Sequence, residues 1–251
     1  MIALSINLNK IALIRNSREG NYPDVIAHGR TALDAGADGI TVHPRPDQRH
    51  IRPGDVRDLS VLCAGRQVEF NVEGNPFAGA QDDYPGLLPL VLETRPQQCT
   101  LVPDSNDQLT SDHGFDLSRD GTRLEPIIQQ LKDAGIRVSL FMDPDKSQIT
   151  RAREAGADRI ELYTGPYAHA VAQQSDDVER IFASHCAAAE HALHLGLGIN
   201  AGHDLNLINL PRYRTLPGLQ EVSIGHALTV DAISMGLTDA VAAYAACLAG
   251  K

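Results

Sequence analysis

The chain has 251 residues, a formal net charge of -10 at pH 7, and an aromatic content of 4% with no Trp. An acidic chain with so few aromatic side chains lacks the broad basic surface and the stacking platform that nucleic-acid-binding proteins use, so we expect any anion site to be local. The length fits one α/β barrel or two small domains.

Short apolar runs alternate with helical stretches along the chain. The predicted strands cover 3–8, 39–43, 68–72, 99–103, 137–142, 159–163, 197–200 and 221–225. The clearest helical stretches cover 23–35, 120–134, 146–155, 176–195 and 228–248. Strands that alternate with helices are typical of βαβ units and a parallel sheet.

A faint internal repeat supports this interpretation. "DAGADGITVH" (34–43), "DAGIRVSLFM" (133–142) and "EAGADRIELY" (154–163) each place a glycine between the end of a helix and the start of a strand. Glycine suits the left-handed position that closes a helix. We therefore predict a single (β/α)8 TIM barrel domain over 1–251, with additional helices that include a segment near 175–195. A doubly wound open sheet is the alternative, but it lacks G-x-G-x-x-G after the first strand.

Several predicted strands alternate apolar and polar residues. Ser5 and Asn7 alternate with apolar residues in the first strand, and Glu161 and Tyr163 do so in the sixth. In a barrel the apolar side must pack on the helices, so we expect the polar side to face the barrel axis. An antiparallel sheet with one hydrated face would give the same alternation and stays an alternative.

Signals for compartment and membrane insertion point to a cytoplasmic protein. The chain contains no run of about 18 consecutive apolar residues, and its start does not have the pattern of a signal peptide. The cysteines (Cys63, Cys99, Cys186 and Cys247) show no C-x-x-C spacing, so we expect reduced thiols.

Titratable residues follow several of the predicted strands. His43, Glu73, His203 and His226 come at or just after the ends of the second, third, seventh and eighth strands. The carboxyl ends of barrel strands meet on one face, and imidazole titrates near neutral pH. We therefore predict a general acid/base site on that face.

Anion sites are predicted at two places. Gly225 in "SIGHAL" lies between the last strand and the last helix, where backbone amides bind phosphate. Arg45 and Arg18 offer forked guanidinium groups for a second anion. We expect Arg49, Arg52 and Arg57 to be solvated.

Two other chemistries remain open at this point. His43, Glu73, His203 and His226 could hold a metal ion, although no tight ligand spacing such as H-E-x-x-H occurs. A Schiff-base aldolase needs a lysine at a strand end, and of Lys10, Lys132, Lys146 and Lys251 it is Lys10 that has this position, with Lys146 a few residues beyond the fifth strand.

Motifs in a fixed order link the chain to a known family. They are "INLNKIALIRNSR", "GADGITVHPRPDQRHI", "EFNVEG", "LVPD", "ELYTGPYA", "GINAGHDLN" and "EVSIGHAL". Together they resemble the pyridoxine 5'-phosphate synthase family of the vitamin B6 pathway, over nearly the whole chain.

The resemblance implies a barrel enzyme that assembles as an octamer. It implies condensation of 3-amino-2-oxopropyl phosphate with 1-deoxy-D-xylulose 5-phosphate to give pyridoxine 5'-phosphate, inorganic phosphate and water, with no metal or organic cofactor. The segment near 175–195 resembles the family's additional helix, which mediates subunit contact.

The resemblance also implies roles for single residues. His43 and Glu73 match proton acceptors, and His203 matches a proton donor. The positions that match the aminoketone-phosphate site are Asn7, Arg18, Gly225 and His226. The positions that match the sugar-phosphate site are Arg45, His50 and Thr110.

The chain departs from the family pattern in two places. Asn9 and Lys10 stand where many members have Asp and His, so we carry no sugar-phosphate role over to them. Asp204 replaces a glycine after His203, where a backbone contact to substrate could survive. A different phosphosugar barrel enzyme, such as a metal-dependent epimerase or an aldolase, and a non-catalytic phosphometabolite-binding barrel remain the alternatives.

Overall fold

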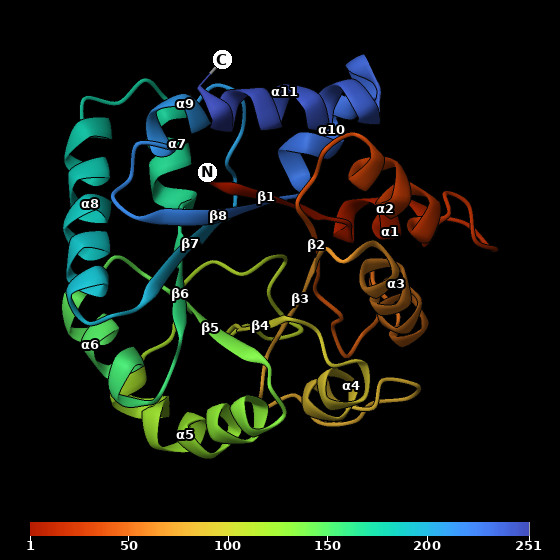
Figure 1. Ribbon diagram of the computed structural model, residues 1–251, viewed down its shortest axis with the longest axis horizontal. Helices are drawn as coiled ribbons and strands as arrows, with labels where there is room; N and C mark the ends of the chain where they lie inside the picture. Colours follow the sequence, from red (N-terminus) through yellow and green to blue (C-terminus); the bar gives the residue numbers. More distant parts are fainter. Residues whose placement is uncertain (251) are drawn as a thin grey trace.

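The computed structural model describes residues 1–250. Within them, parallel strands close into one barrel in chain order from β1 to β8, with helices around it (Figure 1). The strands are β1 (Ala3–Asn7), β2 (Gly39–Val42), β3 (Glu69–Gly74), β4 (Gln98–Leu101), β5 (Arg137–Met142), β6 (Arg159–Tyr163), β7 (Gly198–Gly202) and β8 (Leu219–Ile224). The predicted (β/α)8 barrel is confirmed, and both the open sheet and the antiparallel sheet are wrong.

The helices form an outer ring. They are α1 (Asn9–Arg15), α2 (Val25–Asp34), α3 (Pro53–Arg66), α4 (Leu87–Thr94), α5 (Leu117–Asp133), α6 (Lys146–Glu154), α7 (Gly165–Ala172), α8 (Val178–His194), α9 (Leu210–Tyr213), α10 (His226–Met235) and α11 (Leu237–Ala249). Across residues 1–250, none of these helices combines the length and the apolar character that crossing a bilayer requires.

The helical stretch predicted over 228–248 is confirmed, but it forms two helices, α10 and α11, in place of a continuous one. Gly236 separates them with a φ of 85°, a conformation that glycine adopts far more readily than other residues. The Gly236 amide closes α10 on the Ala232 carbonyl.

The segment predicted near 175–195 forms α8, which packs against α6 and β7 in the outer ring (Figure 1). The shorter α7 precedes it between β6 and β7. Buried Phe182, Ala188 and Ala192 give α8 its inner face, because they recur at helical spacing.

Polar side chains fill the barrel interior, as the strand alternation predicts. The Ser5 and Thr41 hydroxyls lie 2.7 Å apart, and Asn71 donates to the Thr41 hydroxyl at 3.4 Å. Thr100 donates to the Asn71 side-chain oxygen at 3.1 Å. These neighbours satisfy one another, which offsets the cost of removing polar groups from water.

Charged pairs occupy the amino-terminal end of the barrel. Arg159 contacts Glu221 at 3.2 Å and donates to Asn200 at 2.9 Å, and Arg137 pairs with Glu69. The opposite, carboxyl-terminal end is left for the strand-end residues and their loops.

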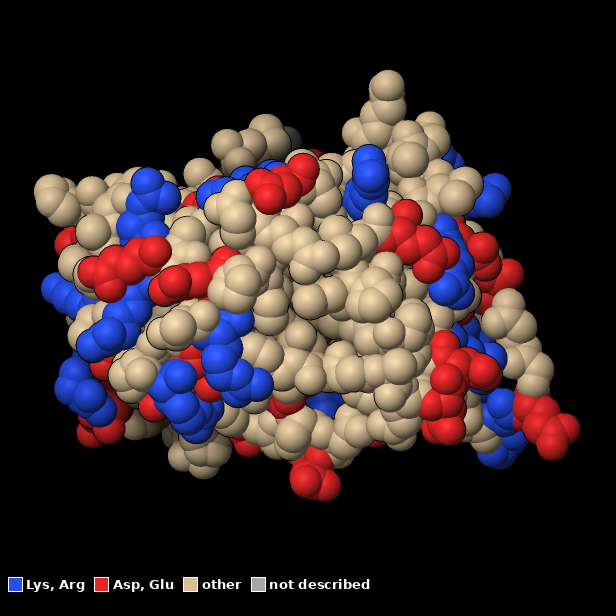
Figure 2. Space-filling model, turned by 90° about the horizontal axis from the view of Figure 1, so that it is seen from below, with Lys and Arg blue, Asp and Glu red and all other residues tan. Residues whose placement is uncertain are grey.

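Acidic and basic side chains are interspersed on the outer face seen in Figure 2. This face therefore does not present charge of a single sign, which agrees with the expectation that anion binding is local.

Candidate active site

A cavity of about 350 Å³ opens at the carboxyl-terminal end of the barrel. The predicted site residues that line it are Asn7, His43, Arg45, His50, Glu73, Thr110, His203, Asp204, Gly225 and His226. They come from different strands and from loops far apart in sequence, which the barrel brings to one rim.

Arg18 does not line this cavity. Its exposed guanidinium donates to the Ser17 carbonyl at 2.8 Å, in the segment after α1. Arg15, three residues earlier, points inward and donates to Asp55 at 2.5 Å. Arg15 is therefore buried, whereas Arg18 lies on the outer surface of the chain.

His43 is the first residue after β2 and is buried between two carboxylates. Its backbone N–H donates to the Asn9 side-chain oxygen at 2.9 Å. Its Nδ1 lies 3.7 Å from Glu73 Oε2, and its Nε2 lies 3.1 Å from Asp104 Oδ2. Burial opposes the charged imidazole, but Asp104 and Glu73 outweigh it and raise the pKa of His43 to about 9.

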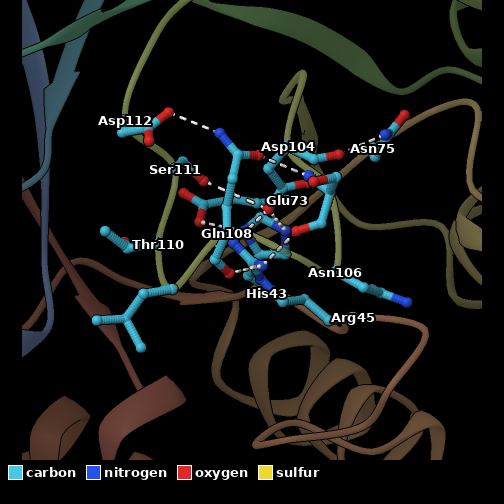
Figure 3. A network of polar contacts seen from close by, with 12 residues as sticks. His43, Arg45, Glu73, Asn75, Asp104, Asn106, Gln108, Thr110, Ser111 and Asp112 are labelled. Atoms are coloured by element: carbon cyan, nitrogen blue, oxygen red, sulfur yellow. Dashed lines mark hydrogen bonds and ion pairs between the residues drawn. The ribbon is translucent and has the colours of Figure 1, made fainter.

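Arg45 is held by the loop between β4 and α5 (Figure 3). Its Nη2 contacts Asp104 Oδ2 at 2.6 Å, and its Nη1 donates to the Ser105 and Gln108 carbonyls at 3.0 Å each. Burial alone would raise the pKa of Asp104, yet His43 and Arg45 hold it below its ordinary value.

The expectation that Arg49 is solvated is wrong. Its guanidinium donates to the Asn106 carbonyl at 2.6 Å and to the Gln108 carbonyl at 2.8 Å, and the residue lines the cavity. Arg45 and Arg49 together therefore fasten the loop over 104–110 at the cavity mouth. These hydrogen bonds to backbone carbonyls join residues far apart in sequence, so local sequence patterns could not predict them.

His50 is buried and its orientation is set by the backbone. The Ile51 N–H donates to His50 Nδ1 at 2.9 Å, so the ring proton lies on Nε2. Burial, together with the positive charges of His43 and Arg45, lowers the pKa of His50 to about 3. At neutral pH His50 is thus a neutral hydrogen-bond donor beside the cavity.

His203 follows β7 and bridges two side chains. Its Nε2 lies 2.7 Å from the Thr110 hydroxyl, and its Nδ1 lies 2.8 Å from Asp204 Oδ2. His203 and Asp204 both have positive φ values, 82° and 60°, which are uncommon for residues with side chains and concentrate at functional sites. The bond to His203 lowers the pKa of Asp204. Asp204 therefore enters the site through its side chain.

The amino terminus of α10 forms another corner of the cavity. Gly225 is its N-cap, and Gly225, His226 and Ala227 line the cavity. A Cβ on Gly225 would lie 3.0 Å from Asn7 Cβ and 3.1 Å from the Asn7 carbonyl oxygen, so glycine lets the ends of β1 and β8 approach. The first amides of a helix attract anions.

Glu161 and Asp104 are functional candidates that the sequence did not single out. Glu161 lines the cavity with 4% of its surface exposed, and burial, then Glu73 and Glu221, raise its pKa well above the ordinary value. The strand alternation was the available signal, because it places Glu161 on the inward side. Asp104 follows β4 in "LVPD" and is not part of a strand, so the alternation of polar and apolar residues could not predict its role.

The two alternative chemistries differ in what the cavity offers them. Within residues 1–250, no three or more His, Cys, Asp or Glu side chains form a group that could hold a metal ion. Lys10 lines the cavity, whereas Lys132 pairs with Asp158 at 2.8 Å. The geometry places titratable side chains between Arg45 with His50 on one side and the amino terminus of α10 on the other, two groups with donors that suit an anion.

Comparisons with known proteins agree with one another. The family model described as "Pyridoxal phosphate biosynthesis protein PdxJ" matches residues 4–250. A protein of Xanthomonas oryzae pv. oryzae named pyridoxine 5'-phosphate synthase is 56% identical over 252 residues, covering 100% of this chain and 98% of that relative. The protein of the same name from Xylella fastidiosa is 54% identical over 243 residues, covering 96% of this chain and 92% of its own.

Solved structures of low identity share the fold alone. Thiamine phosphate pyrophosphorylase from Pyrococcus furiosus superposes with a TM-score of 0.61 at 11% identity, covering 99% of this chain and 96% of its own. Tryptophan synthase from M. tuberculosis gives a TM-score of 0.62 at 12% identity, with coverages of 98% and 92%.

Proposed function

Because the chain belongs to the PdxJ family of pyridoxal phosphate biosynthesis proteins, we propose that it is a pyridoxine 5'-phosphate synthase. It condenses 3-amino-2-oxopropyl phosphate with 1-deoxy-D-xylulose 5-phosphate, and it forms pyridoxine 5'-phosphate, inorganic phosphate and water. The observation that carries the proposal is one cavity with buried acid/base groups between two anion-binding corners.

The side chains suit this chemistry. The substrate amine attacks a ketone, so the nitrogen comes from substrate and no enzyme lysine has to form a Schiff base. Ring closure then needs several proton transfers, which groups with different protonation states can share. Burial lowers the pKa of His50, whereas neighbouring carboxylates raise that of His43 and burial raises that of Glu161, so the three groups differ in their affinity for a proton.

We assign the proton transfers to three residues of the rim. His43 and Glu73 accept protons from the bound intermediates, and their side chains lie 3.7 Å apart. His203 donates a proton to a leaving oxygen, with its ring held between Thr110 and Asp204.

The two phosphates are assigned to opposite corners. The aminoketone phosphate lies at the amino terminus of α10, near Asn7, Gly225 and His226. The sugar phosphate lies near Arg45, His50 and Thr110, where guanidinium and imidazole N–H groups are available once the substrate competes with the loop carbonyls.

Three positions either lie outside the cavity or depart from the family pattern. A contact between Arg18 and the aminoketone phosphate stays a hypothesis. Arg18→Ala tests it, because loss of that contact should raise the KM for this substrate. Asn9 supplies an oxygen to the His43 backbone, as an aspartate would, so its substitution preserves the acceptor. Lys10 adds a fixed positive charge to the cavity wall.

The family also suggests where and how the protein works. We propose a cytoplasmic homo-octamer, which sedimentation of the purified protein and fractionation of cells test. Phosphorylated substrates are its small-molecule partners, and inorganic phosphate is a product.

The decisive assay mixes purified protein with both substrates and follows product absorbance and phosphate release. Equal amounts of both products support the proposal. The absence of product from intact substrates contradicts it, and loss of activity with a chelator favours a metal-dependent phosphosugar enzyme instead.

A further inference from the structure

The buried histidine His43 contacts a different carboxylate through each ring nitrogen. Its Nδ1 faces Glu73, which lines the same cavity, and its Nε2 faces Asp104 at 3.1 Å. The proposed proton transfers use His43 and Glu73 and give Asp104 no task. A base whose second nitrogen is held by a third group is the usual arrangement for directed proton transfer.

We propose that Asp104 is the positioning residue for His43. It holds the Nε2–H, so that Nδ1 faces the cavity as the proton acceptor, and it stabilises the imidazolium that forms. The step uses the neutral ring, in which a substrate proton moves to Nδ1 while the proton on Nε2 stays in the bond to Asp104, which remains a carboxylate throughout. This inference rests on the proposed function, because it concerns the proton step of that reaction.

The contacts of Asp104 fix its carboxylate. Its Oδ2 lies 2.6 Å from Arg45 Nη2 and accepts from the Ser111 hydroxyl at 3.4 Å, in addition to His43. Its backbone carbonyl accepts from the Asn75 side chain at 2.5 Å (Figure 3). With 5% of the side chain exposed, the carboxylate has little freedom to turn away from His43.

A second cavity explains why Asp104 positions and does not react. This cavity, of about 310 Å³, is lined by His43, Arg45 and Asp104 together with 75 and 105–106. The residues of the chain described here that line the substrate cavity include His43 and Arg45 but not Asp104. His43 therefore stands in the wall between the cavities, and Asp104 supports it from the side away from substrate.

Other titratable groups lie near His43 or line the same cavity, and their effect must be separated from that of Asp104. They are Glu73 from β3, Arg45 and His50 from the loop after β2, and Lys10 from α1. Changing Asp104 alone leaves all of these in place. Any change in the protonation of His43 then reports on the Asp104 carboxylate.

The test compares Asp104→Asn, Asp104→Glu and Asp104→Ala with the wild type. Asp112→Asn is the matched control, since Asp112 is an exposed carboxylate of the same loop. We expect kcat to fall at least about tenfold in Asp104→Asn and Asp104→Ala, with partial recovery in Asp104→Glu. The pH at which kcat/KM rises should move down by about 1–3 pH units in Asp104→Asn, because an opposite charge is removed from His43.

Chemical rescue gives a second readout. In Asp104→Ala, formate can reach the empty position from the second cavity while substrate fills the first. We expect formate to restore kcat in Asp104→Ala and to have no effect on the wild type or Asp112→Asn.

Two results would overturn the inference. One is a pH profile that does not move in Asp104→Asn, together with no rescue by formate. The other is a change confined to the KM for the sugar phosphate, which would make Asp104 a partner of Arg45 alone. NMR titration of the His43 ring in the unliganded proteins decides the question even if the wild type shows no turnover, so failure of the proposed function stays distinguishable.

Discussion

His43 makes the stability of the unliganded protein depend on pH in a defined window. Burial opposes its charge, but Asp104 and Glu73 raise its pKa in the folded chain to about 9, above the ordinary value of 6.5. The charged ring therefore stabilises the folded state fully below pH 6.5. This contribution falls as pH rises and is lost once pH passes about 9.

The size of this contribution follows from the two pKa values. Each pKa unit corresponds to about 1.36 kcal/mol, so the interval between 6.5 and about 9 gives about 3 kcal/mol. The side chain is 6% exposed, so solvent screens it little. A substitution that removes the charge but keeps a polar side chain, His43→Gln, should lose this amount at pH 6 and almost none above pH 9.

The assay measures the free energy of unfolding in urea at several pH values between 6 and 9.5. The quantity of interest is the difference between wild type and His43→Gln, because other titrating groups then cancel. Glu221, whose pKa burial and Glu69 raise to about 8, titrates in both proteins, and the contribution of His50 changes only below its ordinary pKa of 6.5, at the lowest edge of this range. His113→Gln is the surface control; its pair with Asp112 is exposed and screened by solvent, so we expect a much smaller effect on stability than in His43→Gln. A difference that stays constant from pH 6 to 9.5 would refute the reasoning.

Three further predictions concern binding and the barrel interior. Gly225→Ala places a methyl group about 3 Å from Asn7, so we expect kcat/KM for the aminoketone phosphate to fall roughly 5- to 100-fold, measured by steady-state kinetics; an unchanged value would contradict the close packing there. Arg45→Gln should raise the KM for the sugar phosphate about tenfold or more, because one forked donor is lost, and an increase for the other substrate alone would contradict the assignment of corners. At pH 9, above the Glu221 pKa of about 8, Arg159→Met leaves the buried carboxylate without its cation and should lower the free energy of unfolding by about 3 kcal/mol; Arg159→Met with Glu221→Gln should recover part of this loss, and thermal unfolding that shows no recovery would contradict the pairing.

Local patterns predicted most of the architecture. The glycines between helices and strands and the alternation of side chains in the strands act over a few residues, so they are visible in the sequence. The same alternation predicted the polar interior, where Ser5 now contacts Thr41. Gly236 was a local signal as well, and it explains why α10 and α11 are separate helices.

The positions of strand ends also predicted much of the candidate site. His43, His203 and Gly225 each follow a strand directly, and the rule that barrel strands end on one face brings them together. The same rule could not predict where the Arg18 side chain lies, because Arg18 is in a loop between two helices and does not follow a strand end.

The sequence by itself therefore determined the barrel, its polar axis and which residues meet at the rim of the candidate site, because these depend on short repeating patterns of polarity and backbone conformation. Only the tertiary structure decided which rim residues become partners. Asp104 contacts His43 and Arg45, from which it is separated by about 60 residues of sequence. Arg49 donates to carbonyls of the loop over 104–110 at a similar sequence separation. Such contacts depend on the conformations of the loops. The Asp104 carboxylate raises the pKa of His43 only once the fold has brought the two residues together.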